Sequence, residues 1–167
     1  MAFANHAPGR LKHPLLSHLT SSRDPNTCAR KLGTVLPLRH LNALTPHPEW
    51  WHQDEVIALP QLPIAANVGS PFCWECNDHP LHWLVLVHDG HATVEQGNQS
   101  HALQQGDGVI FPGQPWALVG QTSSTTTIGF DPLLLLSAAR SLASGQWTPP
   151  PPVRSPLREL LLLPTRT

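Results

Sequence analysis

The residues best suited to chemistry in this sequence are its histidines, of which there are eleven. Several of them lie in one stretch, namely His79, His82, His88, His91 and His101. A zinc site could be drawn from this group, because a metal needs several nitrogen or oxygen donors that converge on one point. However, residues three apart on a strand, such as His79 and His82, face opposite sides of the sheet. The spacing therefore favours surface histidines and predicts neither a metal site nor a cofactor.

A second candidate is the pair of cysteines in Cys73-Trp-Glu-Cys76. In a redox or zinc motif, two cysteines at this spacing normally open a helix or form a tight knuckle. Here they lie in a strand-like run, and no second pair of this kind completes a four-cysteine zinc site. The sequence also has no Gly-x-Ser-x-Gly elbow and no phosphate-binding glycine loop before a helix. We therefore predict no catalytic residues and no enzymatic activity.

Short β-type runs separated by turn residues dominate the middle of the chain. The clearest runs are Leu81–Val87, Ala92–Gln96 and Val109–Phe111. Asp89-Gly90 predicts a hairpin turn after the first run, and Gly97-Asn98 predicts another after the second. Strands this short, with turns at roughly ten-residue spacing, are typical of an antiparallel sandwich or barrel. The fold class predicted is all-β.

The segment from His79 to Trp116 resembles the cupin family. Gly90 stands where the first cupin motif ends, and Gly106 and Pro112 have the separation expected in the second motif. Within cupins, the segment resembles most the N-terminal domain of AraC-type transcription regulators, which senses an effector. The resemblance implies a single cupin-like antiparallel barrel (a double-stranded β-helix), with one or two C-terminal helices and a loose N-terminal arm.

The same resemblance indicates where a cupin would hold a metal. The glutamate of the first motif falls at Trp83 and its two histidines fall at Asn77 and His79, while the last histidine falls at Trp116. An indole Nε1–H only donates hydrogen bonds and cannot ligate a metal. We therefore expect a ligand pocket in place of a metal site, lined by Trp74, Asn77, His79, Trp83 and Trp116. Indole walls suit a planar, aromatic or sugar-like ligand. The alternative is that Trp83 and Trp116 only fill the core.

Three regions are expected along the chain. Residues 1–45 show no sustained periodicity and predict a poorly ordered N-terminal arm, and residues 46–130 form the barrel. Residues 131–167 should contain a helix that starts at Asp131-Pro132, then a polyproline connector and a short terminal helix. The leucines of the two helices exceed what a small barrel can cover, so we expect a homodimer formed through the C-terminal helices.

Charge and hydropathy argue against two classes of partner, nucleic acids and membranes. The formal net charge is −1 and there are two lysines, Lys12 and Lys31, so this chain lacks the basic footprint of a nucleic-acid-binding domain. No apolar run is long enough to cross a membrane, and no secretory signal is present, which predicts a cytoplasmic protein. We predict a non-catalytic domain of an AraC-type regulator that senses a small-molecule effector and dimerises. The helix-turn-helix DNA-binding part is lacking in this chain, which is either an isolated or truncated sensor or a stand-alone relative. The alternative is a small metal-dependent cupin enzyme, an isomerase or dioxygenase.

Overall fold

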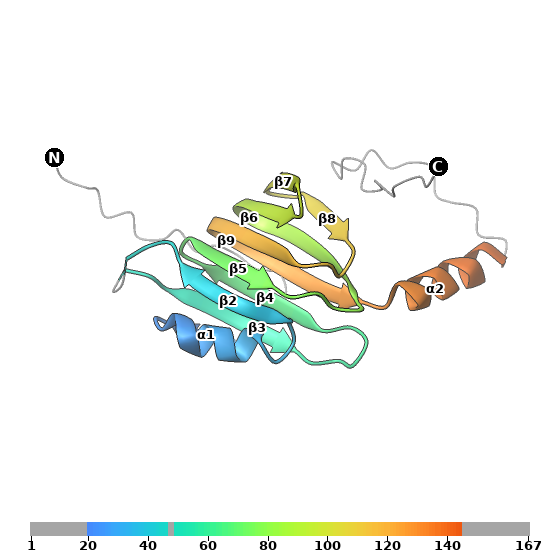
Figure 1. The fold of residues 1–167 in the computed structure, drawn as a ribbon, viewed down its shortest axis with the longest axis horizontal. Coiled ribbons are helices and arrows are strands. Elements are labelled where there is room, and N and C mark those ends of the chain that lie inside the picture. The colour runs from blue at the N-terminus through green and yellow to red at the C-terminus, as the bar shows by residue number, and fades with distance from the viewer. Residues whose placement is uncertain (1–19, 47–48, 145–167) are drawn as a thin grey trace.

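The computed structural model describes residues 20–46 and 49–144, which form nine strands and two helices (Figure 1). This confirms the predicted all-β fold with a C-terminal helix. The elements are β1 (Thr20–Ser22), α1 (Pro25–Leu32), β2 (Leu38–Ala43), β3 (His52–Ile57), β4 (Ile64–Gly69), β5 (Phe72–Cys76), β6 (His82–Gln96), β7 (Gln99–Gln104), β8 (Gly108–Phe111), β9 (Trp116–Phe130) and α2 (Pro132–Ser144).

Two long antiparallel strands, β6 and β9, form the spine of the sheet. Each has 15 residues, and they pair from His82 opposite Phe130 to Glu95 opposite Ala117. On its other edge, β9 pairs first with β5 and then with β4, while β6 pairs first with β8 and then with β7. The sheet therefore curls into two layers that share β6 and β9. One layer adds β8, β4, β3 and β1, and the other adds β7, β5 and β2.

The curl occurs where both long strands bend. The register of β6 against β9 shifts between Val87 and Asp89 and again between Asp89 and His91. Gly90 has a φ of 75°, and Thr122 on the facing strand has a φ of 37°. Bulges of this kind bend a strand without ending it. The predicted hairpin at Asp89-Gly90 is therefore wrong, because β6 runs through these residues. The turn predicted at Gly97-Asn98 is confirmed, since it joins β6 to β7.

The interior is filled by side chains that alternate along the strands. On β6 the buried residues are Trp83, Val85, Val87, Ala92 and Val94, and on β5 they are Phe72, Trp74 and Cys76. Successive residues of a strand point to opposite faces, so each strand contributes every second residue to one core. These residues belong to a single hydrophobic cluster that lies between the two layers.

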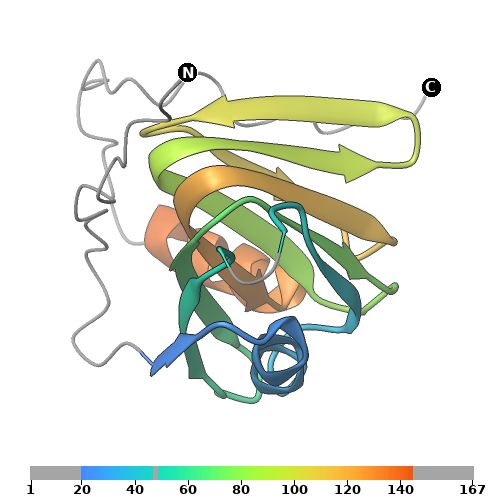
Figure 2. The ribbon, with the colours of Figure 1, turned by 90° about the vertical axis from the view of Figure 1, so that its left-hand side faces the viewer.

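Residues 20–45 differ from the predicted arm, because they form β1, α1 and β2. Asp24 caps α1 by accepting hydrogen bonds from the backbone N–H groups of Asn26 and Thr27, at 3.1 and 3.2 Å. Leu32 and Leu36 are buried in the hydrophobic core cluster. The helix contacts β1, β2 and β3 and closes the barrel on the side between β2 and β3 (Figure 2). The barrel therefore begins well before residue 46.

The C-terminal helix begins as predicted. Asp131 Oδ1 accepts a hydrogen bond of 2.8 Å from the backbone N–H of Leu133, and Pro132 occupies the first turn. Figure 1 shows α2 leading away from the sheet. Four of its side chains are large, apolar and exposed: Leu133, Leu134, Leu135 and Leu136. The predicted polyproline connector and terminal helix lie outside the described residues.

Replacing Gly90 with alanine should destabilise the fold strongly. A Cβ at Gly90 would stand 2.3 Å from the backbone oxygen of Thr122, and the positive φ would strain any side chain. We expect a loss of about 2 kcal/mol or more in the free energy of unfolding, measured by urea denaturation.

Gly97→Ala is the matched control, because Gly97 also has a positive φ, of 56°, but a Cβ there meets nothing within 4 Å. Its cost should be about 1 kcal/mol, from backbone strain alone. Equal losses for the two variants would show that the bend at Gly90 needs no close approach of β6 to β9.

Candidate functional site

The five residues predicted to line a pocket differ in how deeply they are buried. Trp74 on β5, Trp83 on β6 and Trp116 on β9 are buried and face the interior, with exposed fractions of 0%, 0% and 3%. His79 is half-buried and Asn77 is exposed, and both lie in the loop between β5 and β6. The structure thus brings the three indoles into one interior and leaves Asn77 at its rim.

Three of these side chains contact one another. The ring centroids of Trp83 and Trp116 are 6.0 Å apart with an angle of 39° between the planes, and the His79 ring lies 5.7 Å from that of Trp83. Phe111 meets Trp116 edge-on at 4.9 Å. Gly129 leaves room for the Trp83 ring, because a Cβ there would stand 2.7 Å from it. The end of the interior around Trp83 and Trp116 is therefore packed with aromatic rings.

The indole nitrogens remain available for hydrogen bonding. Nε1 of Trp74, of Trp83 and of Trp116 is buried and has no hydrogen-bond partner among the described residues. A buried donor without an acceptor costs free energy, so a group that brings acceptors to this interior would be favoured.

The residues at this place do not fit a metal ion. Nδ1 of His79 accepts a hydrogen bond of 3.3 Å from the backbone N–H of Leu81, and the neighbouring rings of Trp83 and Trp116 offer no lone pair. His82 packs against Phe130, with ring centroids 6.1 Å apart. Within residues 20–46 and 49–144, no three histidine, cysteine or acidic side chains are grouped closely enough to hold a metal.

The cysteines are placed as structural residues. Cys76 is buried, Cys73 on the other face of β5 is half-buried, and both thiols are free. Burial raises the pKa of Cys76 to about 12. Cys28 on α1 is also buried, and its burial together with the nearby charge of Asp54 raises its pKa to about 12. Thiols with such pKa values stay protonated near neutral pH and are poor nucleophiles.

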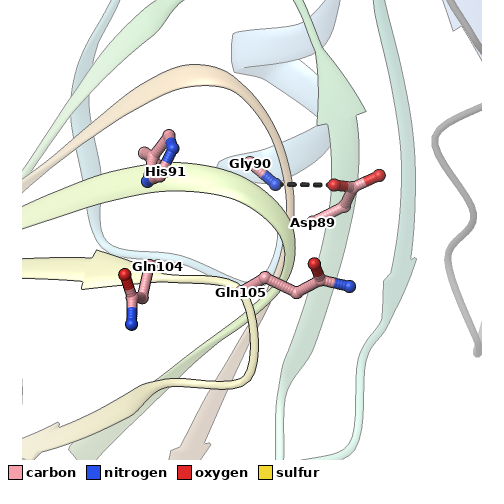
Figure 3. Close-up of a pocket in the computed structure, with 5 residues that line it drawn as sticks. All are labelled: Asp89, Gly90, His91, Gln104 and Gln105. Atoms are coloured by element: carbon pink, nitrogen blue, oxygen red, sulfur yellow. Dashed lines mark hydrogen bonds between the residues drawn. The ribbon is translucent and has the colours of Figure 1, made fainter.

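Two hollows lie on the surface of the barrel. One, of about 410 Å³, is an open and polar depression over the bend of β6, lined by Asp89, Gly90, His91, Gln104 and Gln105 (Figure 3). The other, of about 270 Å³, lies at the rim near the indoles. It is lined by Arg39, Glu75, Cys76, Asn77, Glu95, Gly97, Pro115, Trp116 and Ala117. Two of the five predicted residues, Asn77 and Trp116, therefore border the rim hollow.

Comparison with solved structures identifies the fold. The AraC-like transcriptional activator CuxR superposes with a TM-score of 0.55 and 14% sequence identity, over 75% of this chain and 52% of that chain. The chain has a cupin fold. It shares this fold with CuxR and spans about half the length of that protein.

Two further structures are similar at lower TM-scores. A cupin-like protein from Thermotoga maritima gives a TM-score of 0.42 and 13% identity, over 55% of this chain and 80% of that chain. The cupin domain of an XRE-family transcriptional regulator from Enterobacter cloacae gives a TM-score of 0.42 and 14% identity, over 48% of this chain and 97% of that chain. No protein-family profile matches the sequence, and no curated protein matches it either. None of the described helices has the length and apolar character needed to span a membrane.

The cupin barrel also contains a buried polar surface that the sequence analysis missed. We call it the polar strip; its six residues on β3, β4 and β9 are His52, Asp54, Asn67, Ser123, Thr125 and Thr127, each 2% exposed or less. The registers place Asp54 opposite Asn67 and Asn67 opposite Thr125, and Thr125 Oγ1 donates a 2.6 Å hydrogen bond to Asn67 Oδ1. The signal in the sequence is the run Ser123-Ser-Thr-Thr-Thr127, which puts a hydroxyl at every inward position of a buried strand segment.

Charge within the polar strip is compensated. Asp54 Oδ2 forms an ion pair of 2.9 Å with Lys31 Nζ on α1, which also donates to the backbone oxygen of Asp54. Burial lowers the pKa of His52 to about 4, although the charge of Asp54 opposes the shift, and the charge of Lys31 adds to the lowering. His52 is therefore neutral near pH 7.

Acid should destabilise the cupin barrel through His52. Its pKa is lowered from 6.5 to about 4 in the folded state, so the unfolded chain binds the proton first as the pH falls below 6.5. Stability is therefore retained above pH 6.5 and lost toward pH 4, by about 3 kcal/mol from this residue. Urea denaturation at several pH values measures the slope of the free energy of unfolding against pH.

The variant His52→Gln should flatten this slope, whereas His40→Gln, at an exposed histidine of β2, should leave it unchanged. A slope that survives in His52→Gln would show that other groups cause the acid sensitivity.

Proposed function

We propose that this chain is a non-catalytic regulatory domain that binds a small-molecule effector and dimerises, as part of a regulator of the AraC type. The cupin fold and its likeness to an AraC-like activator support the proposal. Because the chain spans about half of that activator, a DNA-contacting part would belong to the remainder of the regulator. A net charge of −1 is consistent with a domain that does not itself contact DNA. The proposed place of such a regulator is the cytoplasm.

The observation that carries the proposal is the pair of indoles at positions where a metal-binding cupin has metal ligands. Trp83 and Trp116 are buried and face each other at 6.0 Å, so their rings occupy the space that a metal and its substrate would need. Since an indole supplies no lone pair to a metal, this arrangement favours binding over metal-assisted catalysis.

The effector is proposed to enter from the rim hollow. Trp116 borders that hollow, and the exposed Asn77 and half-buried His79 offer polar contacts beside it. A planar ligand between Trp83 and Trp116 needs a ring separation of roughly 7 Å, which is twice the contact distance of about 3.5 Å between carbon atoms. Because the rings are 6.0 Å apart, binding would move Trp116 outward. Trp74 would contact the ligand from β5.

Such a movement has a direct connection to the C-terminal helix. Trp116 is the first residue of β9, and β9 continues to Phe130, two residues before α2. A shift at the start of this continuous strand would change how α2 is presented at its other end. Effector binding could then bias the packing of α2, because a ligand shifts an equilibrium toward the state that it binds better.

Dimerisation is proposed to occur through α2, with a second copy of the chain as the partner. Leu133, Leu134, Leu135 and Leu136 expose between 46% and 71% of their surface, and α2 leads away from the sheet (Figure 1). Successive residues of a helix point about 100° apart around its axis, so these four leucines make α2 apolar on several sides, which is typical of an interface helix. Pairing with the same helix of a second copy would cover part of this apolar surface.

The effector site is tested by intrinsic tryptophan fluorescence during titration with a panel of small metabolites, with a thermal melt alongside. We expect a saturable change with at least one compound and a melting temperature that rises with its concentration. Trp116→Leu should weaken binding of that compound roughly tenfold, because it removes one aromatic wall.

Trp51→Leu serves as the control, since Trp51 is half-buried and lies outside the core cluster. This variant should bind the same compound as tightly as the wild type does. Stoichiometric binding of Fe, Mn, Ni or Zn without any response to metabolites would instead favour the metal-dependent cupin enzyme.

The dimer is tested by light scattering over a dilution series. The wild type should have the mass of a dimer, and the double variant Leu135→Glu with Leu136→Glu should have that of a monomer, because charges on an apolar interface oppose pairing. Leu59→Glu, at a leucine that is 48% exposed on the barrel, should remain dimeric. A wild-type protein that stays monomeric at every concentration would refute this interface.

A further inference from the structure

A row of five aliphatic side chains crosses the outer face of the barrel. The strand registers pair each member with the next, across β3, β4, β9, β6 and β8 in that order. We call it the aliphatic row; its members are Ile57, Ile64, Ile128, Leu84 and Ile110. The outer face of an antiparallel sheet commonly carries polar side chains, so an unbroken aliphatic line over five strands needs a reason.

The aliphatic row lies outside the hydrophobic core. Val56, Val85 and Val109 are chain neighbours of its members and pack in the core cluster, which contains none of the five. Because successive residues of a strand point to opposite faces, the row faces outward. Ile57 and Ile110, at its two ends, expose 44% and 41% of their surface. The row is therefore an apolar surface that the core does not use.

The C-terminal helix carries apolar side chains that the barrel does not cover. Residues 133–140 of α2 are all exposed. The helix has 13 residues, and a helix of this length is marginally stable in water by itself. Its leucines point to several sides, so pairing with one neighbouring helix leaves part of them uncovered. A second apolar surface is needed against the rest of α2.

The connection from β9 directs α2 away from the row of its own barrel. Asp131 alone separates Phe130, the last residue of β9, from Pro132, the first residue of α2. Asp131 also accepts a hydrogen bond from the backbone N–H of Leu133, which fixes the first turn. Helices that fold back onto the preceding sheet typically follow a connection of about two to six residues. α2 therefore projects from the sheet toward other molecules (Figure 1).

We propose that α2 of one copy packs on the aliphatic row of a second copy, so that the two α2 helices lie between the two barrels. This inference rests on the dimer through α2 proposed above and names the surface of the partner that receives the helix. The lengths agree, because the 13 residues of α2 extend about 20 Å and five strands span about 19 Å. Each α2 contacts the other α2 on one side and the other barrel on another.

This exchange connects the interior of one barrel to the helix of its partner. Leu84 follows Trp83 on β6, and Ile128 precedes Gly129, where a Cβ would stand 2.7 Å from the Trp83 ring. The middle of the aliphatic row thus lies on the opposite face of the sheet from Trp83. An effector in contact with Trp83 acts on the surface that holds the α2 of the second copy.

The first test measures the dimer dissociation constant of the full chain by analytical ultracentrifugation. The double variant Ile57→Glu with Ile110→Glu should weaken the dimer roughly tenfold or more, because each carboxylate would be buried against apolar helix surface without a partner. Both positions are exposed in a single copy, so the barrel should keep its circular dichroism spectrum. Leu44→Glu is the matched control: Leu44 is 52% exposed and follows β2 in the other layer, and this variant should dimerise like the wild type.

The second test uses cross-linking to show which barrel holds α2. A tagged chain with Ile110→Cys is mixed with an untagged chain with Leu134→Cys, and a short bismaleimide is added. Both chains carry Cys73→Ser, because Cys73 is half-buried whereas the thiols of Cys28 and Cys76 are buried. We expect a product that joins one tagged to one untagged chain. A single chain with both new cysteines should form no internal link when it is diluted to the monomer.

Three outcomes would overturn the exchange. An unchanged dissociation constant in Ile57→Glu with Ile110→Glu, beside a monomeric Leu135→Glu with Leu136→Glu variant, would leave the α2 dimer standing without the aliphatic row. An internal link in the doubly substituted chain at every dilution would place α2 on its own barrel. A wild type that is monomeric at all concentrations would refute the dimer and the exchange together, while the effector titration would still test the sensor role by itself.

Discussion

Both long strands of this protein change layers halfway along their length, and the backbone at Gly90 and Thr122 makes this possible. Gly90 approaches the carbonyl oxygen of Thr122 so closely that a Cβ would collide with it. The bulges there rotate the second halves of β6 and β9 away from the first halves, so that each half pairs with different neighbours. Every interior side chain discussed above is positioned by this double bend.

The bend also separates the interior into two chemically different regions. The first half of β9 brings Trp116 and Leu118 toward the apolar side chains of β5, while the second half brings Ser123, Thr125 and Thr127 toward His52 and Asn67 on β3 and β4. Trp74 lies between the two regions, packed against Phe72 at 5.0 Å. The aromatic region is already well packed, and both regions hold buried polar atoms that have no hydrogen-bond partner among the described residues. An effector that engages both regions would gain stacking from one and hydrogen bonds from the other.

Closure of the barrel depends on the segment before β3. α1 fits against β1, β2 and β3 through Leu32 and through the ion pair of Lys31 with Asp54. Asp54 is 2% exposed and Lys31 is 29% exposed in its side chain, so the charge of the carboxylate has few other partners. Removing one partner of such a pair costs far more than the pair contributes, which makes α1 a firmly attached part of the barrel.

The sequence determined the strand-rich core, the turn at Gly97-Asn98 and the start of α2 at Asp131-Pro132. These features depend on alternation, turn chemistry and capping, which act over a few residues. It did not determine that β6 continues through Asp89-Gly90, because the same dipeptide suits a hairpin or a bulge and only pairing with β9 selects the bulge. It also missed α1 and β2, whose stability comes from burial of Leu32 and Leu36 against distant strands.

The polar strip was decided by tertiary structure alone. His52, Asn67 and Thr125 are far apart in the sequence, and each is ordinary for an exposed strand face. Only the registers of β3 with β4 and of β4 with β9 place them side by side, and only the curl of the sheet turns that face inward. Sequence reasoning therefore located Trp74, Trp83 and Trp116 as interior residues, because large aromatic side chains are buried in almost any fold. Burial of the hydroxyl run followed from long-range pairing, which leaves no local signal.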